Sequence, residues 1–422
     1  MKEQSAENKS RYLDECLIQR LDSMRTEGLH REIREVDSPQ GAHITMTGRS
    51  LINFSSNDYL GLANEQSLKE AAIEAVRKFG VGSGASRLIS GSLAPHAELE
   101  TALAEFKGTE AALTFSTGYA AALGTICALV GVDDVIILDK LSHACLVDAA
   151  RLCRAKMRVF AHNDLNELES LLKWAAGRAN PAAARPKILI VTESLFSMDG
   201  DAAPLEKLVE LKEQYGAWLM VDEAHATGLY GANRRGLAEE VGVDNGIEIQ
   251  MGTLSKALGA SGGYICGSQT LIEYLVNRAR TFIFSTAPVA ASSAAAIAAI
   301  HFVRSSPGAA RCATLWERVA DLPVQHRPDR GGTGSNVRSA IIPIMIGAEE
   351  EATNAADKLR QAGFYVPAIR YPTVARGKAR LRVSISAAHS IEDIAKLSNA
   401  LRQICPNSGN QPALPHAATV NA

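Results

Sequence analysis

The sequence has little net charge, no paired cysteine motif and no long apolar run. A formal net charge of −2 over 422 residues leaves no strongly basic surface of the kind that binds nucleic acid. The cysteines are scattered without a CxxC pair, which argues against a disulfide framework and a zinc site; they are Cys16, Cys127, Cys145, Cys153, Cys266, Cys312 and Cys405. The apolar stretch 287–302 is rich in alanine and shorter than the ~20 residues of a membrane span. Together with the polar start MKEQSAENKSRYLDE, these absences predict a cytoplasmic protein that binds no nucleic acid, membrane or metal.

Two nucleotide-binding motifs are also missing. Lys256 lies in MGTLSKALGASGGYICG (251–267), but Ser255 precedes it and Ala257 follows it, so the order of a phosphate-binding loop is absent. GVGSGASRLISG (80–91) follows a helix-like stretch rather than a strand, and Ala85 or Arg87 stands where a dinucleotide fingerprint has its third glycine. The sequence therefore excludes both a P-loop enzyme and a Rossmann dehydrogenase.

Between about residues 65 and 290 the sequence contains short apolar runs that alternate with helical patterns. The strand candidates are residues 133–139, 187–194, 218–225, 249–254 and 262–268. Runs that are so uniformly apolar are typical of strands buried on both faces, and helices between them indicate a mostly parallel sheet. The pattern predicts an α/β fold whose central sheet is flanked by helices.

The length of the chain allows one large and one smaller domain. We expect residues 1–55 to form an N-terminal arm with a helix over 10–34 and a short strand from residue 51. Residues 56–292 should form the large α/β domain and residues 293–406 a small α+β domain. The polar end, residues 407–422, should be disordered.

Polar side chains follow several of the predicted strands. His143, Glu193, Asp222, His225 and Lys256 all come shortly after an apolar run. Ligands of open α/β sheets bind beyond the carboxyl ends of the strands, so these groups should meet at one edge. Each group has a plain alternative: a solvated lysine, an aspartate that caps a helix, or an ordinary core histidine.

The combination of lysine and aspartate indicates a specific chemistry. A partly desolvated amine at Lys256 could form a Schiff base with a carbonyl, and a buried carboxylate at Asp222 needs a cationic partner. A lysine on an aldehyde carbon and an aspartate opposite a pyridinium are the two protein groups that pyridoxal 5'-phosphate (PLP) requires. The strand–turn–helix pattern of FSTGYAAALGT (115–125) could hold the phosphate at Ser116–Tyr119, although it could equally be a simple turn.

Several longer motifs resemble the α-oxoamine synthases over about residues 10–405. They are SSNDYLGL, GSGASRLISG, LSHACLVDAARL, VTESLFSMDGDAAPL, VDEAHATGLYG, GTLSKALGASGGY and ARLRVSISAAH. These enzymes are fold-type I PLP-dependent transferases that condense an amino acid with an acyl thioester and release CO2. The resemblance implies a PLP-binding large domain and a homodimer with shared active sites.

The resemblance also implies roles for individual residues. Lys256 would hold PLP and move the proton on the substrate α-carbon, while Asp222 would pair with the ring nitrogen. His225 would bond the phenolic oxygen, and His143 would stack on the ring and contact the substrate. The other expected cofactor contacts are Gly118, Tyr119, Glu193, Ser197, Thr253 and, from the neighbouring subunit, Ser285 and Thr286. The other expected substrate contacts are Arg382, which would clamp the amino-acid carboxylate, Asn57, Arg31 and Thr373.

Within this family the substrate has to be read from smaller differences. AIRYPTVARGKARLR and FSSNDYLGL look most like the branch that joins L-alanine to a pimeloyl thioester, as pimeloyl-CoA or pimeloyl-acyl carrier protein, in biotin biosynthesis. Tyr371 stands where that branch usually has a first proline, and Arg370 argues against a glycine C-acetyltransferase. FSTGY keeps a serine palmitoyltransferase-like activity open. A non-catalytic partner subunit would lack the lysine, which is present here.

Overall fold

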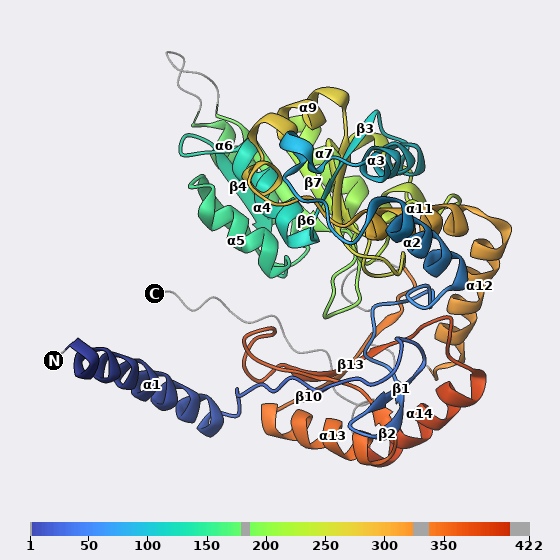
Figure 1. Cartoon of the computed structure of the whole chain (residues 1–422). Coiled ribbons are helices and arrows are strands. Elements are labelled where there is room, and N and C mark those ends of the chain that lie inside the picture. Colours follow the sequence, from blue (N-terminus) through green and yellow to red (C-terminus); the bar gives the residue numbers. More distant parts are fainter. Residues whose placement is uncertain (1, 179–185, 324–336, 406–422) are drawn as a thin grey trace.

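The computed structural model describes residues 2–178, 186–323 and 337–405, so the tail expected at 407–422 lies outside the described part. Figure 1 shows two lobes, of which the upper carries a seven-stranded sheet. The strand order is β3-β9-β8-β7-β6-β4-β5, and β9 is the antiparallel member, between β3 and β8. The bounds are β3 Ala111–Phe115, β4 Val135–Asp139, β5 Lys156–Phe160, β6 Ile188–Glu193, β7 Trp218–Asp222, β8 Ile249–Thr253 and β9 Gly263–Gly267. The predicted α/β fold with a mostly parallel sheet is confirmed.

Helices cover both faces of this sheet, which explains why its strands are apolar throughout. Along β4, Ile137 faces one hydrophobic cluster and Ile136 faces the other. The first face is covered by α3 (Ala94–Lys107), α6 (Leu165–Ala176), α7 (Leu205–Tyr215) and α11 (Ala290–Arg304). The second is covered by α4 (Gly118–Leu129), α5 (Ala144–Leu152), α9 (Gln269–Arg278) and α10 (Arg280–Ile283). Burial on two faces is the arrangement expected of parallel strands.

The remaining elements before the lower lobe are α2 (Gln66–Phe79), which packs on α11, a π-helical turn at Arg87–Gly91, α8 (Leu237–Glu240) and a 3-10 turn at Asp244–Gly246. Helix α12 (Ser306–Asp321) contacts both α11 and α14 (Ile391–Ile404) and so connects the two lobes. Among the described residues, no helix combines the length and apolar character that a bilayer span requires.

The lower lobe is built from segments that lie near the two ends of the sequence (Figure 1). One sheet has the order β10-β13-β12 and the other the order β1-β2-β11. The bounds are β1 His43–Met46, β2 Arg49–Asn53, β10 Ile341–Gly347, β11 Phe364–Tyr365, β12 Ala368–Ile369 and β13 Ala379–Ser384, with α13 at Glu349–Gln361 and α14 at Ile391–Ile404. Because β2 pairs in parallel with β11, the N-terminal strands are part of the same lobe as the C-terminal elements.

The N-terminal helix α1 (Lys2–Thr26) stands away from both lobes in Figure 1. The helix predicted over residues 10–34 is wrong at both ends, because the helix begins at Lys2 and stops at Thr26. Gly28 follows with a left-handed backbone (φ +67), a conformation that ends helices and suits glycine. Leu13, Leu17 and Leu21 recur every four residues and are exposed. The described part of the chain therefore leaves an apolar stripe of α1 uncovered.

Candidate functional site

Neighbouring strands of the large sheet bring the predicted polar groups together at their carboxyl ends. Asp222 ends β7 and lies opposite Glu193, which ends β6, in the parallel register. Thr253 ends β8 on the other side of β7, and Lys256 follows three residues later. His143 precedes α5 beyond the end of β4. The predicted meeting of these groups at one edge of the sheet is what the structure shows.

Asp222 is a buried carboxylate with 5% exposure. Its Oδ1 accepts a hydrogen bond from the Ala224 N–H at 2.9 Å, within a turn. The helix-cap alternative does not apply, since the next helix begins only at Leu237. Burial raises the pKa of Asp222, and the Lys256 ammonium and the Ala224 N–H act in the opposite direction. Among the described residues no cation pairs with Asp222 within 4.0 Å, so a ligand cation would satisfy it.

A second buried carboxylate beside Asp222 has an unused oxygen. Glu193 is 2% exposed, and its Oε1 has no hydrogen-bond partner among the described residues. Burial raises the pKa of Glu193 to about 8, and the charge of Asp222 adds to this shift while the Lys256 ammonium opposes it. A buried oxygen without a partner is costly, which indicates that a bound group completes this site.

Lys256 lies in the turn between β8 and β9 and is partly buried. Burial lowers its pKa, while the carboxylates of Asp222 and Glu193 oppose the shift. The solvated-lysine alternative is therefore not what the structure shows. The small residues around it have a packing reason: a Cβ on Gly259 would lie 2.5 Å from the Ala63 nitrogen. The turn that carries Lys256 therefore packs closely on the backbone at Ala63, while the charges of Asp222 and Glu193 act on its amine.

His225 is linked to Arg382 through a tyrosine that the sequence reasoning missed. The Tyr59 hydroxyl lies 2.6 Å from His225 Nδ1, and Arg382 Nη2 donates to the same hydroxyl at 3.4 Å. Burial, with the positive charges of Lys256 and Arg382, holds the pKa of His225 well below its usual range. A neutral His225 that accepts from Tyr59 at Nδ1 carries its proton on Nε2 and can donate it to a bound group. Tyr59 belongs to the quoted motif SSNDYLGL, but nothing in that motif indicates a partner 166 residues away.

Arg382 is a buried guanidinium that contacts only neutral oxygens among the described residues. It is 4% exposed. Besides Tyr59, it donates from Nε to the Ser197 carbonyl at 2.6 Å, from Nη1 to Ser384 Oγ at 2.7 Å, and from Nη2 to Asn57 Oδ1 at 3.1 Å. A buried positive charge without an acid partner is suited to a ligand carboxylate. The structure thus places Asn57 and Ser197 at the same arginine.

The turn between β3 and α4 is open to solvent and has the form of an anion site. Ser116 and Thr117 are exposed, and Thr117 caps the helix by accepting from the Ala120 N–H at 3.0 Å. Tyr119 donates to Asp148 at 2.5 Å. A Cβ on Gly263 would lie 2.5 Å from the Gly118 Cα, so β9 packs tightly against the start of α4. The helix N-terminus is therefore held next to the β8–β9 turn that carries Lys256.

Four predicted site residues lie apart from this group. Thr286 pairs with Ser86 in an isolated bridge, and Ser285 precedes it in a segment packed on residues 83–92. Arg31 and Thr373 are exposed. Arg370 links their two segments, because its Nη2 donates to the carbonyl of His30, the residue before Arg31, and its own carbonyl accepts from the Thr373 N–H.

These residues fit PLP on the chemistry of their side chains. Asp222 offers the anion that a ring nitrogen proton needs, Lys256 the amine for the aldehyde carbon, and His225 a donor for the phenolic oxygen. The β3–α4 turn offers N–H groups for the phosphate, and the unused Glu193 oxygen lies beside Asp222. No grouping of three or more potential metal ligands occurs in residues 2–178, 186–323 and 337–405.

Comparison with known proteins gives consistent relatives. The profile of the class I and II aminotransferases matches residues 49–401. The chain is 47% identical over 384 residues to an 8-amino-7-oxononanoate synthase of Geobacter sulfurreducens, covering 91% of this chain and 96% of the relative. A serine palmitoyltransferase from S. paucimobilis with bound PLP superposes with a TM-score of 0.84 at 29% identity, covering 93% and 97% of the two chains. The 8-amino-7-oxononanoate synthase of Francisella tularensis superposes with a TM-score of 0.69 at 27% identity, covering 84% and 96%.

Proposed function

Because the chain belongs to the class I and II aminotransferase family, among its α-oxoamine synthases, we propose that it condenses L-alanine with a pimeloyl thioester. The product is 8-amino-7-oxononanoate, an intermediate of biotin biosynthesis, and CO2 is released. The protein is an acyltransferase of PLP fold type I, with PLP as its cofactor. The observation that carries this proposal is the buried arginine without an acid partner, Arg382, whose positive charge acts on Lys256 in the same site.

The cofactor residues have separable tasks. PLP, when bound, supplies the electron sink that stabilises negative charge on the substrate α-carbon. Asp222 would keep a proton on the ring nitrogen, because a buried carboxylate strongly favours a neighbouring cation. Lys256 would hold the aldehyde carbon and move the proton of the substrate α-carbon as an uncharged amine, a form that its lowered pKa favours. His225 would donate from Nε2 to the phenolic oxygen, with Tyr59 fixing the orientation of its ring.

Substrate binding is assigned to two groups of residues. Arg382, aligned by Asn57 and Ser197, binds the carboxylate of L-alanine with a charge-assisted pair of hydrogen bonds. Bond formation between the α-carbon and the pimeloyl carbonyl breaks the thioester and releases the free thiol of CoA or of the acyl carrier protein. Loss of the carboxylate as CO2 and return of a proton to the α-carbon then give the product. Arg31 and Thr373, whose segments are linked by Arg370, would contact the pimeloyl thioester on its CoA or acyl carrier protein.

The active protein is proposed to be a homodimer with shared sites. Large apolar side chains are exposed around the segment that carries Ser285 and Thr286: Val81 and Ile89 are 81% exposed and Phe284 is 69% exposed. Covering such side chains supports association of two copies. In that arrangement Ser285 and Thr286 reach the phosphate site of the partner. The buried thiols of Cys145, Cys153, Cys266 and Cys312 support a cytoplasmic location, where thiols stay reduced.

A second candidate substrate pair is L-serine with a long-chain acyl thioester. It is favoured by the higher TM-score to serine palmitoyltransferase, 0.84 against 0.69. The 47% identity to the Geobacter sulfurreducens relative favours L-alanine instead.

The test is an absorbance titration of the purified protein with PLP. L-alanine, L-serine and glycine are added separately, followed by pimeloyl-CoA or palmitoyl-CoA, and products are identified by mass spectrometry. L-alanine should shift the cofactor band, and pimeloyl-CoA should then yield 8-amino-7-oxononanoate. Lys256→Ala should remove the band of the bound cofactor and turnover. A response restricted to L-serine and palmitoyl-CoA would assign the other substrate pair, and turnover by Lys256→Ala would refute the mechanism.

A further inference from the structure

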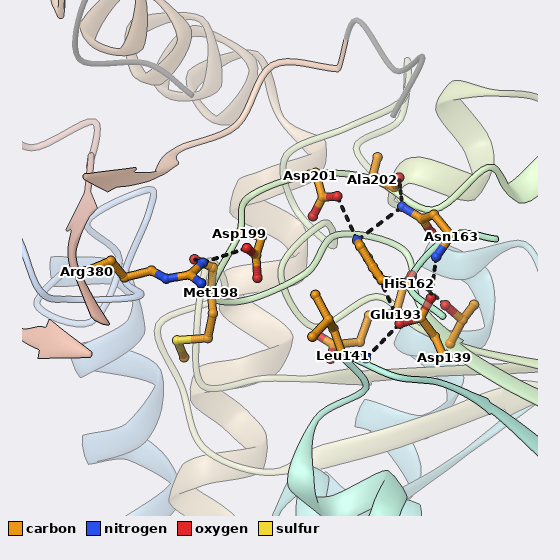
Figure 2. Close-up of polar contacts among 11 residues, drawn as sticks. Asp139, Leu141, His162, Asn163, Glu193, Met198, Asp199, Asp201, Ala202 and Arg380 are labelled. Carbon is orange, nitrogen blue, oxygen red and sulfur yellow. Dashed lines mark hydrogen bonds and ion pairs between the residues drawn. The ribbon is translucent and has the colours of Figure 1, made fainter. Parts of the chain in front are cut away.

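Outside the residues assigned so far, His162 lies between two carboxylates (Figure 2). Its Nδ1 is 3.0 Å from Asp139 Oδ1 and its Nε2 is 2.8 Å from Asp201 Oδ2. Asp139 is fully buried and also accepts from the backbone N–H groups of Leu141 at 2.8 Å and Asn163 at 2.9 Å. Burial alone would lower the pKa of His162, but the two carboxylates outweigh it and raise the pKa to about 10. His162 is therefore an imidazolium that bridges two acids at neutral pH.

One of these acids, Asp201, lies in the loop that follows β6 and attaches this loop to His162. In residues 194–203 the Phe196 N–H donates to the Asp201 carbonyl at 2.9 Å, and the Ala203 N–H donates to the Ser194 carbonyl at 3.0 Å, so the loop closes on itself. The Phe196 ring also packs edge-on against the His162 ring, with centroids 4.4 Å apart. The base of the loop is thus attached to the large domain by an ion pair and a ring contact.

The tip of the same loop is attached to β13 in the other lobe. Arg380 Nη1 lies 2.5 Å from Asp199 Oδ1 and donates to the Met198 carbonyl at 3.2 Å. Two residues further along β13, Arg382 donates from Nε to the Ser197 carbonyl at 2.6 Å. Figure 2 shows Arg380 reaching the loop from one side while the His162 group lies on the other. The loop therefore spans from the large sheet to the strand that carries the carboxylate-binding arginine.

We propose that His162, Asp199 and Arg380 are positioning residues for Arg382. Their contacts hold loop 194–203 in a fixed position between the large sheet and β13, so that the loop acts as a strut that determines where Arg382 lies. Asp201 fixes one end of the strut to His162, and Asp199 fixes the other end to Arg380. The Ser197 carbonyl, two residues before Asp199 in the same loop, then determines where the guanidinium lies relative to Lys256. A displacement of about 1 Å can reduce the efficiency of such a site about 10²-fold, so the ion pairs matter for substrate binding even though they touch no substrate.

The inference rests on the proposed function, because it assigns Arg382 to the amino-acid carboxylate. It therefore makes a selective prediction. Loosening the strut should weaken the binding of L-alanine, which has a carboxylate. It should leave the binding of ethylamine unchanged, because ethylamine is L-alanine without that group. A residue that only stabilises the fold would affect both amines or neither.

The experiment measures dissociation constants of L-alanine and ethylamine from the absorbance of the PLP-loaded protein. His162→Gln removes the imidazolium, and Asp199→Ala removes the partner of Arg380 at a position that is 33% exposed and thus tolerant of change. The matched control is His43→Gln, since His43 also contacts a carboxylate, Asp393 at 3.2 Å, but is largely exposed and lies away from the loop. PLP affinity and thermal unfolding of each variant are recorded alongside.

We expect His162→Gln and Asp199→Ala each to raise the dissociation constant of L-alanine about tenfold. The dissociation constants of ethylamine and PLP should stay at wild-type values in both variants, and all three constants should stay at wild-type values in His43→Gln. Unchanged L-alanine binding in both variants overturns the strut, and equal weakening of both amines assigns these residues a purely structural role, which also overturns it. If the wild-type protein itself shows no preference for L-alanine over ethylamine, the proposed function fails at Arg382. If His162→Gln does not fold, Asp199→Ala decides the matter alone.

Discussion

Replacing Lys107 by methionine should destabilise the protein strongly, because it breaks a fully buried ion pair behind the cofactor site. Lys107 Nζ lies 2.6 Å from Glu223 Oε2, and each side chain is 1% exposed. Glu223 follows Asp222 directly and also accepts from the Ala238 N–H at 2.9 Å. Removing one partner of a buried pair costs about 3–5 kcal/mol, since the remaining charge stays buried and unpaired.

This cost can be converted into a melting temperature. An unfolding entropy of about 2.1 cal/mol/K per residue gives roughly 0.9 kcal/mol/K for 422 residues. Lys107→Met should therefore lower the Tm by about 3–6 °C, measured by calorimetry at pH 7. PLP should also dissociate more readily, because an uncompensated Glu223 carboxylate adjoins Asp222.

A double-mutant cycle with Glu223→Gln tests the cause. If the uncompensated carboxylate is responsible, the variant Lys107→Met with Glu223→Gln should melt higher than Lys107→Met alone, since no charge is left buried. Additive losses in the double variant would contradict this reasoning and would attribute the effect to packing of the lysine stem.

Three shorter predictions concern the arginine, the loop and its histidine. Arg382→Gln should raise the dissociation constant of L-alanine about 10–100-fold in the absorbance titration while PLP affinity is retained. Gly200→Ala should lower the urea midpoint, because Gly200 has φ +68 and a Cβ there would lie 2.3 Å from the Ile341 carbonyl oxygen; Gly363→Ala, with φ +94 and open space, is the control. The pKa of His162 is raised from 6.5 to about 10, so its stabilisation is full below pH 6.5 and is lost as the pH rises through 10. The difference in unfolding free energy between wild type and His162→Gln should shrink over that window.

Apolar runs predicted the five inner strands of the large sheet and missed the two at its edges, β3, which is buried throughout, and β5. The run 133–139 contains β4, and the four other predicted runs contain β6, β7, β8 and β9. Strand β5 (Lys156–Phe160) lies at the sheet edge, with Arg158 and Val159 exposed, so its sequence lacks a continuous apolar run. The end of α1 was also placed too late, because a helical pattern alone does not fix where a glycine turns the backbone.

The candidate site divides in the same way. Lys256, Asp222 and His225 follow strands, and strand ends meet at one edge in any parallel sheet, so the sequence could predict their proximity. Tyr59 and Lys107 could not be found like this. Their partners are 166 and 116 residues away and depend on how separate segments pack. Ser285 and Thr286 remain predictions, because their role requires a second copy of the chain.

The pairing of β2 with β11 has a consequence for how the protein is made. Ile52 lies opposite Phe364, so the partner strand is synthesised about 310 residues later. At about 5–20 residues per second, the ribosome reaches β11 roughly 15–60 s after β2. Phe54 also accepts from the Ser384 N–H at 2.8 Å, and the Asn53 carbonyl lies 3.0 Å from His389 Nε2, both still nearer the end. During translation β1 and β2 therefore have no partner strand while the large sheet is synthesised. The lower lobe is the last part of the protein that can fold.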